Sequence, residues 1–254
     1  MTNKRYGAIC PVSHACKILE PRWTIHILTE MWAGSTRFNE IRRGVGNISP
    51  GLLSKRLKEL EIVGMVDRVE DKATGTVDYF RTQKAIDLEP ALNSLGAWAQ
   101  QNIAAEIALC DTDVSAMMWK LRRDIHSETF PAERVILRFR FTDAGLKKNT
   151  FWMVFYPSGE RDLCVTAPGY DIDLYIETNL VAFGGILTGR TTIARELENG
   201  GLFLSGDARL ARTMGDWLPF SVYIDVGGIV PLRSDSQAYA NPIGDRQDRV
   251  EMAE

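Results

Sequence analysis

The sequence predicts an α+β protein in which a helix-turn-helix unit precedes a second α+β domain. Three observations predict it: two helical segments joined by a glycine-rich turn, a pair of alternating strand segments directly after them, and a run of strands and then helices beyond residue 110. With 254 residues, two domains are favoured over one. We expect domains at 1–110 and 111–230, and a polar, disordered tail at 231–254.

The helix predicted at residues 49–63 has one apolar face and one cationic face. Ser49 is a good N-cap, Pro50 lies at the first helical position, where its missing N–H costs nothing, and Gly64 suits the end of the helix. Three leucines share one face, and the opposite face carries Gly51, Ser54, Lys55 and Lys58. Such a face suits the major groove of DNA, because small side chains allow close approach and lysines neutralise phosphates. Taken alone, the pattern also fits an ordinary amphipathic helix.

The flanking segments favour the DNA-binding interpretation. Upstream, residues 35–43 predict a shorter helix, and a glycine-rich turn joins it to the next one. Downstream, residues 65–70 and 76–81 are alternating, β-prone runs joined by a hairpin tip that carries Lys72. Helix, turn, helix and hairpin together predict a winged helix. Residues 37–84 hold ten cations against seven acids, so a small excess must be reinforced by two such modules in a dimer.

Short motifs follow one another along this half of the chain: Cys10-Pro11-Val12, Trp23-Thr24, Arg37-Phe38-Asn39-Glu40-Ile41, Ile48-Ser49-Pro50, Leu53-Ser54-Lys55-Arg56-Leu57-Lys58-Glu59-Leu60, Gly64-Met65-Val66 and Asp78-Tyr79. In order and spacing, over about residues 7–109, they resemble the HxlR-type winged-helix transcriptional regulators of bacteria. The resemblance implies a homodimer on an inverted-repeat operator in double-stranded DNA. One departure is Ala85, which stands where a glycine is expected soon after the wing.

The residues expected at the DNA combine the cationic helix face with neighbouring positions of the motifs. They are Arg37, Ser49, Gly51, Ser54, Lys55, Arg56, Lys58 and, at the tip of the wing, Lys72. The resemblance implies that the helix at 49–63 lies in the major groove and that the wing lies near the backbone.

A long helical stretch is predicted from residue 82 or 83 to about 109, with a bend rather than an end at Pro90. Its apolar residues recur close to every seventh position, and those assigned to a subunit seam are Leu88, Leu92, Leu95 and Trp98. Such a stripe needs a partner. The partner is either its own domain or the same helix of a second subunit.

The second half predicts strands followed by helices, which indicates a sheet covered on one side. Its expected helices are at 113–124, 180–187, 191–198 and 207–217, and its strands are at 134–141, 151–156, 163–166, 172–177 and 202–204.

The segments Thr178-Asn179-Leu180 through Gly189-Arg190, Gly200-Gly201-Leu202, Gly206-Asp207 and 210–218 resemble the sterol-carrier-protein type 2 fold, over about residues 113–219. The resemblance implies a tunnel for a small hydrophobic ligand, for which we expect the lining Leu137, Phe139, Val181, Ala182, Phe183 and Ile186. A ligand-responsive repressor would follow. The alternative is a tunnel filled by its own side chains, in a domain that only stabilises the dimer.

Composition predicts a soluble cytoplasmic protein without a membrane partner. Hydrophobic residues make up 45 % and charged residues 25 % of the chain, which is ordinary for globular proteins. The net charge of -3 combines a slight cationic excess before residue 110 with an acidic remainder, so nucleic-acid contact is expected in the first half. Residues 25–32 are too few, and too often interrupted by polar side chains, for a membrane span.

No feature of the residues favours an enzyme or a lipid carrier that does not bind DNA. The histidines His14, His26 and His126 have no recognisable catalytic context, and the glycine pairs lack the spacing of a phosphate loop. Four cysteines, at positions 10, 16, 110 and 164, have neither zinc-site spacing nor the density of a disulfide scaffold. We therefore expect no metal and no cofactor.

Cys10 supplies an alternative mode of control. In the resembled family a cysteine before proline can sense oxidants or electrophiles, and Cys10 matches that position. Reactivity needs an exposed, stabilised thiolate, for which the nearby Lys4, Arg5 and a following helix N-terminus are suitable. An inert N-terminal cysteine is the competing interpretation. The other three cysteines are expected to be buried apolar residues.

Overall fold

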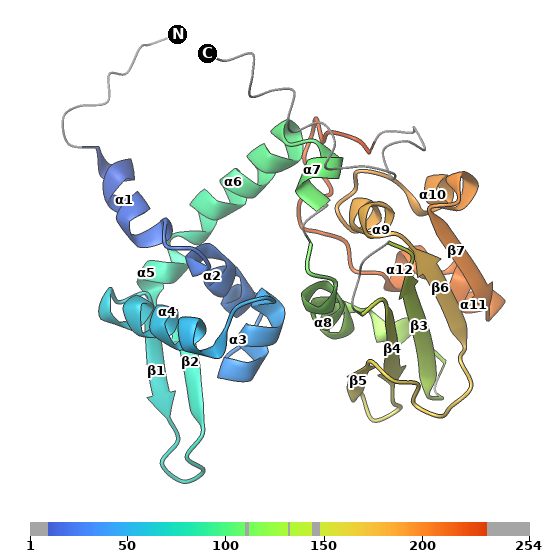
Figure 1. The fold of residues 1–254 in the computed structure, drawn as a ribbon, viewed down its shortest axis with the longest axis horizontal. Coiled ribbons are helices and arrows are strands. Elements are labelled where there is room, and N and C mark those ends of the chain that lie inside the picture. The colour runs from blue at the N-terminus through green and yellow to red at the C-terminus, as the bar shows by residue number, and fades with distance from the viewer. Residues whose placement is uncertain (1–9, 110–111, 132, 144–147, 233–254) are drawn as a thin grey trace. The chain divides into compact units, whose positions relative to one another are not determined.

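The structure, a computed structural model, describes residues 10–109, 112–131, 133–143 and 148–232 (Figure 1). Contacts divide the chain into two compact units, residues 1–92 and 93–254. The division falls within helix α6 (Glu89–Asn102), which therefore begins in one unit and ends in the other. The domain boundary after residue 110 stays a prediction. Most of the expected tail lies outside the described residues.

The first unit is a helix-turn-helix with a small hairpin, as predicted. Its elements are α1 (Pro11–Leu19), α2 (Thr24–Trp32), α3 (Phe38–Val45), α4 (Pro50–Ile62), β1 (Val66–Glu70), β2 (Val77–Arg81) and α5 (Gln83–Ile86). The two strands are antiparallel, and Val66 lies opposite Arg81. All three leucines of the apolar face of α4 are buried, at 0 to 3 % exposure, in one cluster with Ile27 and Ile41. Each contributes about 1.5 to 3 kcal/mol by leaving water, and together they fix which face of α4 looks outward.

The single long helix predicted after the wing is wrong. The structure divides it into α5, α6 and α7 (Ala105–Leu109). Pro90 was expected to bend a continuous helix, but it lies in the first turn of α6, where its missing N–H breaks no helical hydrogen bond. Ala85, the departure from the family pattern, is fully buried in α5.

The second unit is a mixed α/β domain with a five-stranded sheet. Its strands β3 (Val135–Phe141), β4 (Thr150–Phe155), β5 (Arg161–Cys164), β6 (Leu174–Thr178) and β7 (Leu202–Gly206) lie in the order β5-β4-β3-β6-β7. Only the β3–β6 pair of this sheet is parallel. Its helices after α7 are α8 (Val114–Asp124), α9 (Leu180–Leu187), α10 (Ile193–Asn199), α11 (Ala208–Arg212) and α12 (Met214–Trp217), with a 3₁₀ turn at Ser127–Thr129. The helix expected at 207–217 is thus two shorter helices, with Thr213 between them.

Alternation along β3 separates two faces of this sheet. Leu137 and Phe139 are fully buried in a core shared with apolar residues of α8, α9, α11 and α12. Arg138 and Arg140, the intervening residues, point to the opposite face. Helices therefore cover one face of the sheet, as expected, and the other face carries charged and aromatic side chains.

Candidate nucleic-acid interface

The start and end of α4 are fixed by its own sequence. The Ser49 hydroxyl accepts a hydrogen bond from the Leu52 N–H at 3.3 Å, and Pro50 occupies the first turn. Gly64 follows the helix with φ +71°, a left-handed conformation that glycine adopts without strain. These signals place the outward face of α4 at the positions that the sequence predicted.

That outward face is small and basic. Gly51, Ser54, Lys55 and Lys58 are all exposed. The Lys55 ammonium lies 4.0 Å from the Glu59 carboxylate, a weak surface pair, and Lys58 has no charged partner among the described residues. The amines are therefore available to phosphates, and the absence of large side chains at Gly51 and Ser54 permits close approach to a nucleic-acid groove.

Arg56 differs from the other cations of α4. Its side chain is only 18 % exposed, forms an ion pair with Glu59, and donates a hydrogen bond from Nε to the Arg22 carbonyl at 3.1 Å. These contacts brace α4 against the segment before α2. A DNA contact by Arg56 stays a prediction, and the structure gives this arginine a second, structural role.

Arg37 joins the helix-turn-helix to the wing. It forms an isolated β-bridge with Asp78, and its Nε lies 3.6 Å from the Asp78 carboxylate. The neighbouring Thr36 hydroxyl donates to the same carboxylate at 2.8 Å, and its carbonyl accepts from the Tyr79 N–H at 2.8 Å. The Arg37 side chain is still 56 % exposed. It can therefore hold strand β2 and remain accessible to a phosphate.

Asp71 orders the tip of the wing and leaves Lys72 exposed. The Asp71 carboxylate accepts from the Thr74 hydroxyl and from the Ala73 N–H, each at 2.8 Å, and these two bonds lower the pKa of Asp71. Gly75 completes the turn with φ +68°. Lys72 has no ion-pair partner among the residues that the structure describes, so its charge projects from an ordered loop.

Sequence reasoning missed a buried acid that positions α3. Glu30 of α2 is fully buried and accepts a hydrogen bond from the Ser35 hydroxyl at 2.6 Å. It packs so closely on Gly44 that a Cβ there would collide with the Glu30 carboxylate. Ser35 was expected inside a helix and Gly44 in the turn after it, and their shared contact with an acid on another helix left no pattern in the sequence.

The residues assigned to a subunit seam differ in burial. Leu88 packs against the core of the first unit, and Leu92 is 8 % exposed. Leu95 and Trp98, by contrast, are 50 % and 53 % exposed. Leu88 therefore contributes to the core of its own unit, whereas Leu95 and Trp98 are accessible to another chain. The assignment of these residues to a subunit seam stays a prediction.

The residues expected to line a ligand tunnel lie in the packed interior of the second unit. All six are at most 9 % exposed. The Phe183 ring makes edge contacts with Phe139 and Phe141 at centroid distances of 5.8 and 5.9 Å, so aromatic rings occupy much of this interior. Val181 belongs to a smaller cluster with Ala105 and Leu109. A tunnel among these residues stays a prediction.

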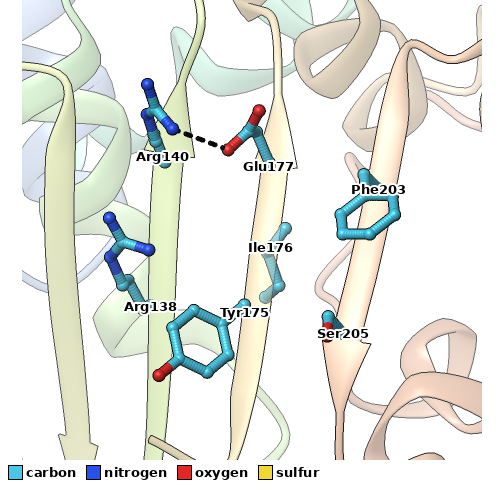
Figure 2. Close-up of a pocket in the computed structure, with 7 residues that line it drawn as sticks. All are labelled: Arg138, Arg140, Tyr175, Ile176, Glu177, Phe203 and Ser205. Atoms are coloured by element: carbon cyan, nitrogen blue, oxygen red, sulfur yellow. Dashed lines mark hydrogen bonds and ion pairs between the residues drawn. The ribbon is translucent and has the colours of Figure 1, made fainter.

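A hollow of about 280 Å³ lies on the opposite face of the sheet, between β3, β6 and β7. Figure 2 shows the residues of this outer hollow, which are Arg138, Arg140, Tyr175, Ile176, Glu177, Phe203 and Ser205. Sequence reasoning missed it, although the strand alternation that placed Leu137 and Phe139 inside also placed the two arginines outside.

The cysteines occupy different environments. Cys10 is the N-cap of α1, where the backbone N–H groups of Ser13 and Val12 lower the pKa of its thiol. Cys16 and Cys164 are half-buried rather than fully buried, and burial raises the pKa of Cys164. Cys110 lies outside the described residues. No group of three or more metal-binding side chains occurs in the described part of the chain, and no helix there is long and apolar enough to cross a membrane.

A helix-turn-helix with a hairpin wing and an exposed basic helix defines the class of DNA-binding transcriptional regulators. The HxlR-like helix-turn-helix family matches residues 18–107. The uncharacterized HTH-type transcriptional regulator YvaP of Bacillus subtilis is 38 % identical over 95 residues, which cover 37 % of this chain and 88 % of YvaP. The HTH-type transcriptional regulator YodB of B. subtilis is 32 % identical over 109 residues, which cover 42 % of this chain and 97 % of YodB.

A solved structure, the reduced form of YodB from B. subtilis, is 33 % identical with a TM-score of 0.35, and the match covers 37 % of this chain and 95 % of that one. Through about its first 100 residues, the chain belongs to the HxlR-like helix-turn-helix family of transcriptional regulators. The five-stranded domain lies outside the region that the family matches.

Proposed function

We propose that this protein is a homodimeric, sequence-specific repressor that reads an inverted-repeat operator with α4. The observation that carries the proposal is the division of α4 into a buried leucine face and an exposed face of Gly51, Ser54, Lys55 and Lys58. Small residues and lysines on one exposed helix face match what a major-groove helix needs. The wing, with Lys72 at its tip, adds a backbone contact on the same unit.

The exposed part of α6 supports assembly into a dimer. Leu95 and Trp98 lie three residues apart on this helix and are about half exposed, and large apolar side chains left in water commonly mark a contact surface. Two copies related by a twofold axis would place two α4 helices on half-sites of opposite orientation. The inverted repeat follows from that symmetry.

Selection from a random duplex library with the full-length protein tests the proposal. An inverted repeat should emerge, and a fluorescence titration on that duplex should show that Lys55→Ala and Lys58→Ala each weaken binding by about 1 kcal/mol and reduce its salt dependence. Arg209→Ala is the matched control, because Arg209 is an exposed cation on α11 of the other unit. Unselective binding, or full affinity in both lysine variants, would remove α4 from the interface.

The proposal extends to control by a small hydrophobic effector held by the second unit. The support is a second compact unit with its own core and a hollow on its open sheet face. A ligand alters DNA affinity only when it binds the free and the DNA-competent forms unequally. The expected observation is therefore a compound that changes both the stability of the second unit and the operator affinity of the intact dimer.

Control by oxidation of Cys10 is a second candidate. The favouring observation is the position of Cys10 at the N-cap of α1, where backbone N–H donors lower the pKa of its thiol. Under this alternative the second unit is structural only. Loss of an oxidant effect on DNA binding in Cys10→Ser, but not in Cys164→Ser, would favour it over the effector.

A further inference from the structure

Arg138 lies between two aromatic rings on the open face of the five-stranded sheet. Its guanidinium carbon lies 5.5 Å from the centroid of the Tyr175 ring on β6 and 6.0 Å from that of Trp152 on β4. The strand register places both rings directly beside it, because Arg138 is paired with Trp152 on one side and with Tyr175 on the other. Two flanking aromatic rings hold a guanidinium by cation–π attraction and leave its N–H edge unused.

Arg140, on the same strand, has a carboxylate partner, whereas Arg138 has none among the described residues. Arg140 donates a hydrogen bond to the Glu177 carboxylate at 3.1 Å, the pair drawn in Figure 2. The lining of the outer hollow thus holds two guanidinium groups and one carboxylate, and the carboxylate is already paired. One positive charge remains, on an arginine whose fork of N–H donors matches a carboxylate.

Exposed aromatic side chains complete the outer hollow. Phe203, on the edge strand β7, is 63 % exposed, and Tyr175 is 39 % exposed. Ser205, from the same strand as Phe203, adds an exposed hydroxyl. A planar ring laid on this surface would remove apolar area from water and place a hydrogen-bond acceptor near the hydroxyl. The volume of about 280 Å³ is close to the lower limit of small-molecule sites, about 300 Å³.

We propose that the outer hollow binds a small planar aromatic carboxylate, with its carboxylate on Arg138 and its ring on Tyr175 and Phe203. This inference rests on the proposed function, because it names the site and the chemical class of the effector held by the second unit. It moves the site from the packed core to the open sheet face.

An aromatic sheet face could also bind a single nucleic-acid strand. The charge of this half of the chain favours the small aromatic carboxylate over that strand. Residues 110–254 carry 16 cations and 21 acids, so this half of the chain repels a polyanion. A single carboxylate needs only the one unpaired arginine. The acidic balance therefore favours a small monoanion.

Calorimetric titration of the full-length protein with 2-naphthoate tests the proposal. We expect saturable binding, binding of 2-naphthamide that is about tenfold weaker or worse because it has the same rings without the charge, and no binding of acetate. Arg138→Gln should weaken naphthoate binding about tenfold or more. Arg138→Lys should give a smaller loss, because it keeps the charge but not the fork.

Arg134→Gln is the matched control, since Arg134 also lies over a tyrosine ring, that of Tyr170 at 3.6 Å, but outside the outer hollow. It should bind naphthoate as the wild type does. Phe203→Ala should weaken naphthoate and naphthamide by similar factors, because it removes only ring contact.

Equal binding of naphthoate and naphthamide, full affinity in Arg138→Gln, or no binding of naphthoate at all would each overturn the proposal. Tighter binding of a single-stranded oligonucleotide at the same arginine would also overturn it. Operator affinity is measured separately with and without naphthoate. If naphthoate binds through Arg138 but operator affinity does not change, the binding site is supported. The effector role in the proposed function, and with it the regulatory part of this inference, is then contradicted.

Discussion

Exposed cations of the first unit and the buried arginine of the second unit use their donors in opposite ways. In the first unit, Lys58 and Lys72 are exposed and have no charged partner among the described residues. In the second unit, the buried Arg190 directs its donors inward to backbone carbonyls, and Arg161 does the same with the Arg123 carbonyl. A cation can recruit a partner only where its donors are not already used, so residue type alone does not reveal which unit binds an anion. In the second unit Arg138 lies against two aromatic rings rather than against backbone carbonyls, which is why we propose it as an anion site.

Substitution of Arg190, whose donors point inward, should have the largest effect on stability of the changes predicted below. Its Nε donates to the Gln100 side chain at 2.8 Å, and its Nη1 donates to the carbonyls of Ile103 and Val230 at 2.8 and 3.1 Å. Arg190→Met keeps the aliphatic bulk but leaves these acceptors unpaired in a buried site. We expect the free energy of unfolding of the second unit to fall by about 3 kcal/mol, measured by urea denaturation of the full chain.

Arg209→Met is the control for that substitution, because Arg209 is exposed on α11. It should leave the unfolding transition within about 0.5 kcal/mol of the wild type. Equal destabilisation by both variants would mean that the Arg190 hydrogen bonds contribute nothing specific. The contrast between inward and outward cations would then lose its energetic basis.

Local signals predicted the elements that both units build from neighbouring residues. The limits of α4 followed from Ser49, Pro50 and Gly64, and α9 was predicted at its observed limits, Leu180–Leu187. The continuous helix at 82–109 was not found. Helix α6 begins beside Pro90, because proline fits the first turn of a helix better than its interior, and the break between α6 and α7 has no such marker in the sequence.

Two other features, one of the backbone and one of strand order, left no signal of this kind. Trp23 adopts a left-handed φ of 82° before α2, which is rare for a bulky residue and has no sequence signature. The pairing of Arg138 with Trp152 and Tyr175 depends on strand order, with β6 entering parallel to β3 and beside it. The alternation of apolar and polar residues along β3 predicts that Arg138 faces outward, but it does not predict which aromatic rings flank it.

The second prediction concerns the proposed dimer and contrasts the buried Leu92 with the exposed Leu95 and Trp98 of α6. Leu95→Lys combined with Trp98→Lys should give a folded protein whose dimer dissociation constant rises by at least about thirtyfold, the effect of losing a hot spot of about 2 kcal/mol. Leu92→Lys should instead lower the free energy of unfolding, because Leu92 is 8 % exposed and an unpaired charge there is costly. Sedimentation and circular dichroism distinguish the outcomes. A double variant that remains as dimeric as the wild type would move the seam away from α6.

The third prediction contrasts two lysines of the first unit. Lys72 projects from the wing, whereas the Lys84 ammonium donates to the Val63 carbonyl at 2.8 Å. Lys72→Ala should weaken operator binding by less than about 1 kcal/mol and reduce the slope of log affinity against log salt by about 0.9 for each wing on the DNA. Lys84→Ala should leave the slope unchanged. Equal slopes in Lys72→Ala and the wild type would place the wing away from the phosphates.

The smallest expected effect is a difference in thiol reactivity between the units. Backbone N–H donors at the start of α1 lower the pKa of Cys10, whereas burial raises the pKa of Cys164. Since the thiolate is the reactive form, the alkylation rate of Cys10 should reach half its maximum below the ordinary thiol pKa, and that of Cys164 above it. Iodoacetamide labelling of the folded protein from pH 6 to 10, resolved by peptide mass spectrometry, measures both profiles. Coincident profiles would show that the helix start does not stabilise the Cys10 thiolate, and the redox alternative would lose its chemical support.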